Sequence, residues 1–222
     1  MASSGEQDAS FSKGMAAGIV AALAGLTGSA GCELILDATE AAVLTPTTGQ
    51  ILIDNKAPGP VTKAIISYLP ERTYLDRRTT IKKTLDFFQD FYKDFNKKTA
   101  QKLLKDLDLD EDQKISAMSK GMQEKLQLIL VMSRKAKLYI LDEPLGGVDP
   151  ATRDYILDTI LKNFNPNASL IISTHLISDI ERILDEVIFI DKGQIVLQSD
   201  ADALRAKYKT SIDAIFRKEM KC

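Results

Sequence analysis

Two acidic residues, Asp142 and Glu143, directly follow a short apolar run at 138–141. Such a run is typical of a central parallel strand that is buried on both faces. In open α/β sheets, ligands bind beyond the carboxyl ends of the strands. An aspartate placed there can hold Mg²⁺, which prefers carboxylate and phosphate oxygens, and an adjacent glutamate can polarise an attacking water molecule. Taken alone, the two acids also fit a solvated strand end.

Three further motifs accompany this strand end. The segment 146–150 (GGVDP) follows it at once, His175 stands just after the apolar run 170–173, and the segment 118–123 (MSKGMQ) precedes a helical pattern. A hydroxyl, a glycine backbone and a helix N-terminus together form an anion site. From residue chemistry alone, the sequence predicts a magnesium–phosphate site at the end of the run 138–141.

The elements that must position these residues alternate between strand and helix after Lys137. Alternation of this kind predicts an α/β sheet. The helix expected at 151–164 has one apolar face, formed by Ile156, Leu157, Ile160, Leu161 and Phe164. The expected elements are the strands 138–141, 170–173 and 187–190, the helices 151–164 and 176–185, and a hairpin turn at 191–194.

A helical block interrupts the strands on the N-terminal side of Lys137. Helical spacing of apolar residues runs over 80–108 and again over 121–134, with an acidic loop at 108–114 between them. The expected strands before this block lie at 19–23, at 50–54, where a turn at 55–59 closes the strand, and at 63–69, where Pro70 stops it.

In this order and spacing, the motifs resemble the nucleotide-binding domain of an ATP-binding cassette (ABC) transporter. The resemblance runs from about 50 to 208, is most specific between 114 and 200, and is greatest to bacterial ATPase subunits whose signature reads SKGM. It implies an α/β fold: a P-loop NTPase (RecA-like) core with an inserted helical subdomain, within one nucleotide-binding domain spanning 1–222. The implied boundaries are a core at about 11–72 and 136–205, a helical subdomain at about 73–135 and a C-terminal tail at 206–222.

The resemblance also implies a role for each residue at the strand ends. Asp142 matches the acid that holds Mg²⁺, and Glu143 matches the catalytic glutamate that orients water. His175 matches the switch histidine that contacts the γ-phosphate. Asp149 matches the acid that communicates across a dimer of cassettes.

Two other segments are implied to bind nucleotide. Ser119, Gly121 and Met122 belong to the signature loop, which caps the ATP of the other subunit. Lys120 replaces a glycine of that loop, where it either adds positive charge near the phosphates or is an ordinary solvated lysine. Glu71 stands where the family usually has a glutamine; it keeps the acceptor oxygens and loses the amide donor, and it also fits a surface turn.

The phosphate loop departs from the family pattern G-x-x-x-x-G-K-[ST]. The matching segment is 25–33 (GLTGSAGCE), in which Gly25, Gly28 and Gly31 are the candidate nucleotide-binding residues. Gly31 stands at the lysine position if Gly25 opens the motif, and Cys32 does if Gly31 is the second glycine. Loss of a charge-assisted phosphate contact costs roughly 1.5–3 kcal/mol, about one to two decades of affinity. Glu33 would add repulsion, because a carboxylate there competes for the anion site.

The segments on either side of this loop also differ from the family pattern. Residues 33–45 lack the apolar helix that normally follows the loop, and only 24 residues precede Gly25. Three explanations of this departure remain open: divergence in a non-hydrolysing relative, an altered or frame-shifted stretch between about 14 and 45, and replacement of the N-terminus by design.

Composition excludes several other classes of protein. The net charge of −2 in 222 residues gives no indication of a nucleic-acid-binding face, so no nucleic acid is expected as a partner. Two cysteines exclude a disulfide framework, and a single histidine excludes a multi-histidine metal site. The longest apolar run, 15–26, is shorter than the roughly 20 residues of a membrane span.

The resemblance implies an ABC-type ATPase. Its function would be to couple the binding and hydrolysis of ATP, with Mg²⁺, in a homo- or heterodimer of cassettes to transport by a separate transmembrane permease subunit. The chain would then be cytoplasmic and peripheral on the inner face of the cell membrane. One alternative is a degenerate cassette that acts as a non-hydrolysing binding or regulatory module. Another is a lipid-anchored extracytoplasmic protein, since Lys13 and an apolar stretch precede Cys32.

Overall fold

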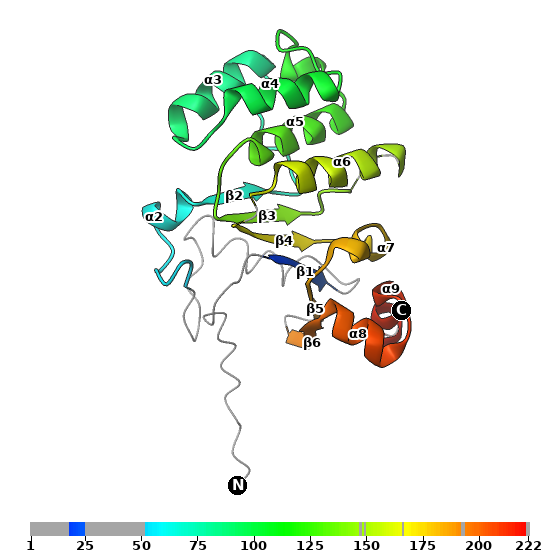
Figure 1. Cartoon of the computed structure of the whole chain (residues 1–222). Coiled ribbons are helices and arrows are strands. Elements are labelled where there is room, and N and C mark those ends of the chain that lie inside the picture. The colour runs from blue at the N-terminus through cyan, green and yellow to red at the C-terminus, as the bar shows by residue number, and fades with distance from the viewer. Residues whose placement is uncertain are drawn as a thin grey trace.

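The computed structural model describes residues 18–24, 52–146, 148, 150–165, 167–191 and 194–220. Within this part of the chain, six strands form one sheet in the order β2-β3-β4-β1-β5-β6 (Figure 1). The first five strands run parallel, and β6 pairs antiparallel with β5. The expectation of an α/β fold is therefore confirmed. The strands are β1 (Gly18–Ala24), β2 (Ile66–Leu69), β3 (Leu138–Asp142), β4 (Ser169–Ser173), β5 (Glu186–Asp191) and β6 (Gln194–Asp200).

Alternating residues of the central strands point to the two faces of the sheet, as strand geometry requires. In β3, Tyr139 and Leu141 join the core cluster on the face covered by helices, whereas Leu138 and Ile140 join the cluster on the other face. Every residue of β3 is buried. The prediction of a strand buried on both faces is confirmed.

Helices α6 (Pro150–Asn163), α7 (Ile177–Ile180) and α9 (Ile212–Glu219) cover one face of the sheet, together with the end of α5 (Figure 1). Phe216 of α9 packs edge-on against Phe189 of β5, with ring centroids 5.2 Å apart. The segment expected to be a C-terminal tail therefore contributes to the core through α9, which follows α8 (Ala201–Tyr208). On the apolar face of α6, Ile156, Leu157 and Ile160 are buried, whereas Leu161 is 38% exposed.

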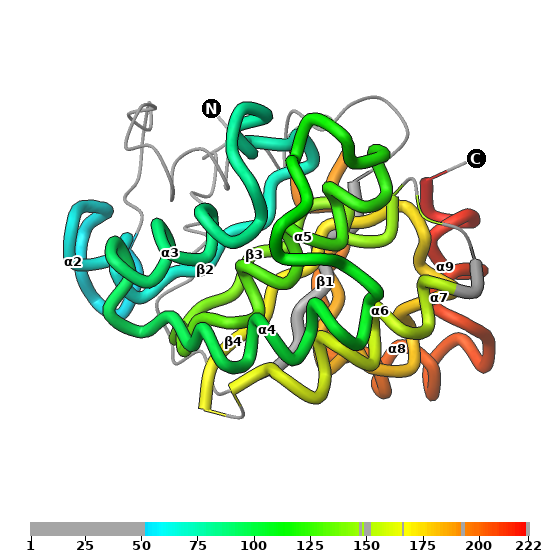
Figure 2. Tube along the Cα trace, turned by 90° about the horizontal axis from the view of Figure 1, so that it is seen from above, coloured from blue at the N-terminus to red at the C-terminus, as the bar shows by residue number. Residues whose placement is uncertain are grey.

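A second hydrophobic cluster lies among helices α3 (Ile81–Phe91), α4 (Lys97–Asp106) and α5 (Lys120–Met132), which stack beyond the β2 edge of the sheet (Figures 1 and 2). A polar side chain fixes where each helix begins. The hydroxyls of Thr80 and Ser119 and the amide oxygen of Asn96 accept hydrogen bonds from backbone N–H groups of the first turns. Both helical predictions for this block are confirmed, with a break between Phe91 and Lys97.

Three predicted elements differ from the structure. Ile53 and Lys56 form a two-residue bridge around Asp54 and Asn55, both at positive φ, so the described part of 50–54 is a tight turn and not a strand of the sheet. The strand expected at 63–69 begins only at Ile66, because Pro60 opens the short helix α2 (Pro60–Lys63). The helix expected at 176–185 is the short α7 followed by a 3₁₀ turn at Glu181–Ile183.

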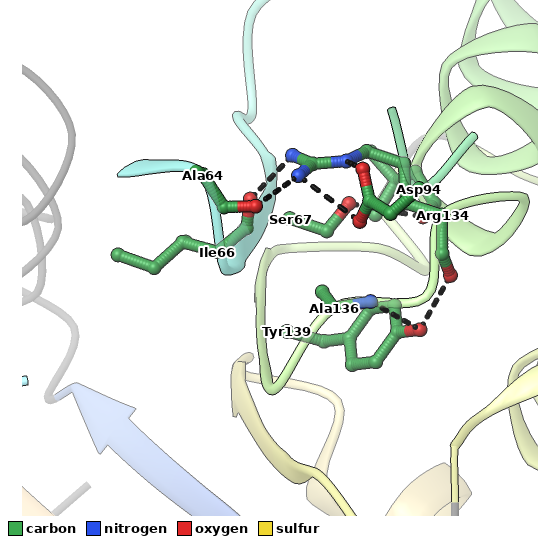
Figure 3. A network of polar contacts seen from close by, with 8 residues as sticks. Ala64, Ile66, Ser67, Asp94, Arg134, Ala136 and Tyr139 are labelled. Atoms are coloured by element: carbon green, nitrogen blue, oxygen red, sulfur yellow. Dashed lines mark hydrogen bonds and ion pairs between the residues drawn. The ribbon is translucent and has the colours of Figure 1, made fainter. Parts of the chain in front are cut away.

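Arg134 joins the helical block to the sheet (Figure 3). Its Nε and Nη2 lie 3.1 Å and 3.2 Å from the two carboxylate oxygens of Asp94, in the loop between α3 and α4. Its guanidinium also donates to the backbone carbonyls of Ala64 and Ile66, at the start of β2. The guanidinium carbon lies 3.9 Å from the ring centroid of Tyr92. A single buried cation therefore holds three separate segments together.

Tyr139 continues this network inside the sheet (Figure 3). Its hydroxyl donates to the carbonyl of Arg134 at 2.6 Å and accepts from the N–H of Ala136 at 3.3 Å. The side chain is fully buried. Burial raises the pKa of the Tyr139 phenol, and the hydrogen bond from Ala136 opposes this rise only in part.

We expect Tyr139→Phe to lower the free energy of unfolding at neutral pH by about 1–2 kcal/mol, because the hydrogen bonds of the hydroxyl are lost. A raised pKa in the folded state stabilises the protein fully below the unfolded pKa of about 10, and this stabilisation is lost as pH rises through the folded pKa. The difference between wild type and Tyr139→Phe should therefore shrink above about pH 10. Urea unfolding between pH 7 and 11 measures this difference, with Tyr74→Phe, at a half-exposed tyrosine, as the control. A difference that stays constant with pH would contradict the expectation.

Candidate functional site

The carboxyl ends of three strands meet at one edge of the sheet. Asp142 of β3 pairs in register with Ser173 of β4, and Ser173 pairs in turn with Ala22 of β1. The carboxyl end of β1 thus lies at the edge of the sheet where Asp142 lies. The predicted strand 19–23 is confirmed as β1. The candidate loop residues Gly25, Gly28 and Gly31, and likewise Asp149, lie outside the described residues.

The carboxylate of Glu143 is held by the residues that follow β4. Its Oε1 accepts from the backbone N–H of His175 at 3.1 Å and lies 2.8 Å from His175 Nδ1. Its Oε2 accepts from the hydroxyl of Thr174 at 3.2 Å. Both carboxylate oxygens are therefore held, and because the Glu143 side chain remains 24% exposed, water can still reach the group.

The contact with Glu143 also fixes the tautomer of the His175 ring. A carboxylate oxygen only accepts hydrogen bonds, so Nδ1 carries the hydrogen in this pair. The other ring nitrogen, Nε2, takes no part in this pair, and the His175 side chain is 59% exposed. The two predicted catalytic residues, Glu143 and His175, are therefore brought together.

Asp142, the last residue of β3, directly precedes Glu143. It is 8% exposed, and its Oδ1 accepts a hydrogen bond from the hydroxyl of Ser173. Sequence reasoning missed the roles of Ser173 and Thr174. Their position directly before His175 is the one signal that could have indicated them, since it places their hydroxyls beside the acids of the neighbouring strand.

The backbone at Glu143 adopts a conformation that side chains rarely allow, with φ at 46°. Its N–H donates to the carbonyl of Ser173 at 2.9 Å, and its carbonyl accepts from the N–H of Gly146 at 2.9 Å. A Cβ at position 146 would lie 3.2 Å from that carbonyl oxygen, which explains the glycine there. Backbone strain of this kind concentrates at functional sites.

The signature segment begins α5, which runs over the sheet opposite in direction to β3 (Figure 1). The hydroxyl of Ser119 accepts from the N–H of Met122 at 3.2 Å, and Met122 itself packs against the helical cluster. A Cβ on Gly121 would meet open space. Lys120 is 84% exposed and lies 3.5 Å from Glu124, as in a solvated lysine on a helix surface. Between described residues, no hydrogen bond or ion pair joins this segment to Glu143.

Glu71 is exposed, two residues beyond the end of β2. Because Leu69 pairs in register with Leu141, this turn lies at the same edge of the sheet as Glu143. No contact between the two glutamates is present.

The residues at this edge fit a magnesium ion that is bound together with a nucleotide. Asp142 offers a carboxylate held in place by Ser173, and carboxylate oxygen is the ligand type that Mg²⁺ prefers. Among the described residues, no group of three or more potential ligands could hold a metal ion by itself. Mg²⁺ usually takes one or two protein carboxylates and completes its shell with water and substrate phosphates.

Comparison with known proteins gives a consistent result. The family model described as "ABC transporter" matches residues 9–146, more than half of the chain. The chain is 28% identical over 185 residues to the uncharacterised ABC transporter ATP-binding protein YxlF of Bacillus subtilis, covering 81% of this chain and 61% of that protein. It is 29% identical over 202 residues to the energy-coupling factor transporter ATP-binding protein EcfA2 of Staphylococcus aureus, covering 82% and 69%.

A solved structure described as the ATP-binding subunit of an ABC transporter superposes with a TM-score of 0.79 at 22% identity, covering 91% of this chain and 88% of that one. This likeness shows that the two share a fold, that of the ABC ATPase domain. The chain spans 50–61% of the length of four Bacillus subtilis ABC transporter ATP-binding proteins that it matches. In the described ranges, every helix is too short or too polar to cross a membrane. On the extent of the family match, this chain belongs to the ABC transporter family.

Proposed function

We propose that this chain is the ATP-binding subunit of an ABC transporter, an ABC-type ATPase that couples ATP binding and hydrolysis to transport by a separate membrane subunit. The observation that carries the proposal is the placement of Glu143, held by Thr174 and His175 beside Asp142 at the edge where β1 ends. The names of the matched relatives agree with it, since they are ATP-binding proteins of ABC transporters.

In this function, Glu143 orients the water that attacks the γ-phosphate in line, and His175 contacts that phosphate. Asp142 would hold Mg²⁺, which neutralises charge on the phosphates when it is bound with ATP. The fixed Glu143 carboxylate supplies a proton acceptor that needs little reorientation before attack. Glu71, at the same edge, is a candidate contact for the nucleotide.

A second cassette is the proposed partner across the nucleotide. Ser119, the N-cap of α5, is exposed and Gly121 is half-buried, and no hydrogen bond joins either of them to Glu143 or His175 among the described residues. This placement supports capping of a partner's ATP by the signature segment, in a homo- or heterodimer. The missing lysine of the loop 25–33 makes such capping more important, because fewer charges of the chain itself face the phosphates.

The proposed membrane partner is a transmembrane permease subunit. Three exposed aromatic residues on and before α3 support a docking surface for it: Tyr74 is 46% exposed, Phe87 59% and Phe91 66%. Phe87 and Phe91 stack with centroids 5.8 Å apart, so they present one apolar surface. A subunit docked in this way would lie in the cytoplasm, peripheral on the inner face of the membrane.

We also propose that the chain divides into a RecA-like core at about 11–72 and 136–205 and a helical subdomain at about 73–135. The separate hydrophobic cluster of α3, α4 and α5 supports this division. Arg134, which bonds to β2 and to the loop before α4, then stands at the joint between the two parts.

One sequence observation favours a second candidate function. The segment 25–33 contains no lysine and carries Glu33 where a hydroxyl is expected. A degenerate cassette of this kind would dock to its partner without turning over ATP.

Titration calorimetry with Mg²⁺-ATP, paired with a phosphate-release assay, separates these functions. Micromolar binding with phosphate release supports the ATPase. Binding without release in wild type supports the non-hydrolysing module. No binding at millimolar ATP would overturn the proposal that this chain is an ATP-binding subunit.

Rebuilding the loop tests the contribution of the missing lysine. We expect the variant Ala30→Gly/Gly31→Lys/Cys32→Ser/Glu33→Thr to bind Mg²⁺-ATP about 10- to 100-fold more tightly than wild type, because it restores a charge-assisted phosphate contact and removes a repulsive carboxylate. The matched control carries Gly31→Met in place of Gly31→Lys, which adds side-chain length without charge. Equal affinities of the rebuilt variant and this control would show that the lysine contributes nothing here.

A further inference from the structure

We propose that Thr174 is a positioning residue that aims the carboxylate of Glu143, an inference that rests on the ATPase function proposed above. Thr174 is 2% exposed, and its hydroxyl bridges two groups. It lies 3.2 Å from Glu143 Oε2 and 3.0 Å from the backbone N–H of Leu176.

The direction of these two hydrogen bonds is determined by their chemistry. The N–H of Leu176 can only donate, so the hydroxyl oxygen accepts from it. The single hydroxyl hydrogen is then left for Glu143 Oε2, which as a carboxylate oxygen can only accept. The Leu176 N–H therefore orients the Thr174 hydroxyl toward Glu143.

The Glu143 carboxylate is thereby held at both oxygens. Oε1 is engaged by the backbone and ring of His175, and Oε2 is engaged by Thr174. Two anchored oxygens fix the plane of the carboxylate, whereas contacts to Oε1 alone would leave the group free to rotate about its last torsion, which has broad minima. The β-branched threonine is itself restricted at χ1, so it makes a stiff support.

His175 is the only histidine in the 222 residues, which makes it a spectroscopic reporter. In a tag-free protein labelled with ¹⁵N, the ring signals belong to His175 alone. Because its Nδ1 lies 2.8 Å from Glu143 Oε1, a rotation of the carboxylate changes the ¹⁵Nδ1 shift. This readout does not depend on turnover.

The test compares Thr174→Val with Thr174→Ser. Valine keeps the shape and removes the hydroxyl, whereas serine keeps the hydroxyl. We expect Thr174→Val to shift the His175 ¹⁵Nδ1 signal and to lower kcat for ATP by about 10-fold or more with an unchanged KM, since misplacing a reacting group costs rate rather than binding. Thr174→Ser should restore most of both. Thr159→Val, at another buried threonine in α6, is the matched control for a buried methyl-for-hydroxyl exchange.

A background lacking the carboxylate separates positioning from a general structural effect. Thr174→Val also removes the acceptor of Leu176, and this loss could disturb the turn before α7. In a Glu143→Ala background, a positioning role predicts no further change of the His175 signal on adding Thr174→Val. A shift of equal size in that background would overturn the proposal, as would wild-type signals and kcat in Thr174→Val itself. If wild type binds Mg²⁺-ATP without turnover while the Glu143-dependent shift is seen, the ATPase proposal fails and the positioning contact stands.

Discussion

Replacing Glu143 by glutamine should lower the rate of ATP hydrolysis by about 10²- to 10⁴-fold, the usual contribution of a general base. The affinity for Mg²⁺-ATP should stay near the wild-type value, because glutamine has almost the same size as glutamate and can keep the contacts of this side chain with Thr174 and His175. Phosphate release and titration calorimetry on the same protein samples measure the two quantities.

The structure indicates that this variant keeps its fold. The amide oxygen of glutamine can still accept from the N–H and Nδ1 of His175, and its NH₂ can donate to the hydroxyl of Thr174, which lies 3.2 Å from Oε2. A loss of activity in this variant would therefore reflect the loss of the catalytic carboxylate and not unfolding. Glu186→Gln is the matched control, since Glu186 begins β5 at the opposite edge of the sheet. Hydrolysis by Glu143→Gln at the wild-type rate would refute a catalytic role for this carboxylate.

Replacing Arg134 by alanine should lower the free energy of unfolding by about 3–5 kcal/mol, the range for breaking a buried ion pair on one side. The Arg134 side chain is 4% exposed and that of Asp94 is 25% exposed. Its removal leaves the Asp94 carboxylate and the carbonyls of Ala64 and Ile66 without this donor. For a chain of this size, the melting temperature should fall by about 10 °C or more.

An exposed pair within the same chain provides the control. Arg78 also binds Asp76 through two nitrogens, with side chains 90% and 47% exposed. We expect no measurable change for Arg78→Ala, because solvent screens exposed pairs. The double variant Asp94→Ala/Arg134→Ala should be less destabilised than the sum of the single variants, since no carboxylate is then left without its partner. Equal stabilities of Arg134→Ala and Arg78→Ala would contradict the expected role of the network.

Sequence patterning located the elements with strong local signals. The helices within 80–108 and 121–134 have Thr80, Asn96 and Ser119 as N-caps, and these residue types are preferred at that position. The strand before Asp142 and Glu143 was equally readable, because a buried parallel strand needs apolar residues on both faces.

The strands expected at 50–54 and 63–69 differ from the structure because two local conformational preferences compete in each segment. Residues 60–69 include four β-branched residues, but Pro60 pre-sets the first turn of α2 and delays the strand to Ile66. The strand expected at 50–54 rested on the apolar run 51–53, yet Asp54 and Asn55 tolerate positive φ and close a turn there.

By itself, the sequence determined that two acids end a buried strand, that a lone histidine follows another, and that the loop 25–33 lacks a lysine. These are properties of residue type and short spacing. Only the tertiary structure decided that Thr174 and His175 hold Glu143 across 31 and 32 residues, and that Arg134 reaches Asp94 across 40. The physical reason is that these contacts join residues far apart in the chain and depend on packing of the whole core, whereas hydrophobic periodicity indicates only local structure.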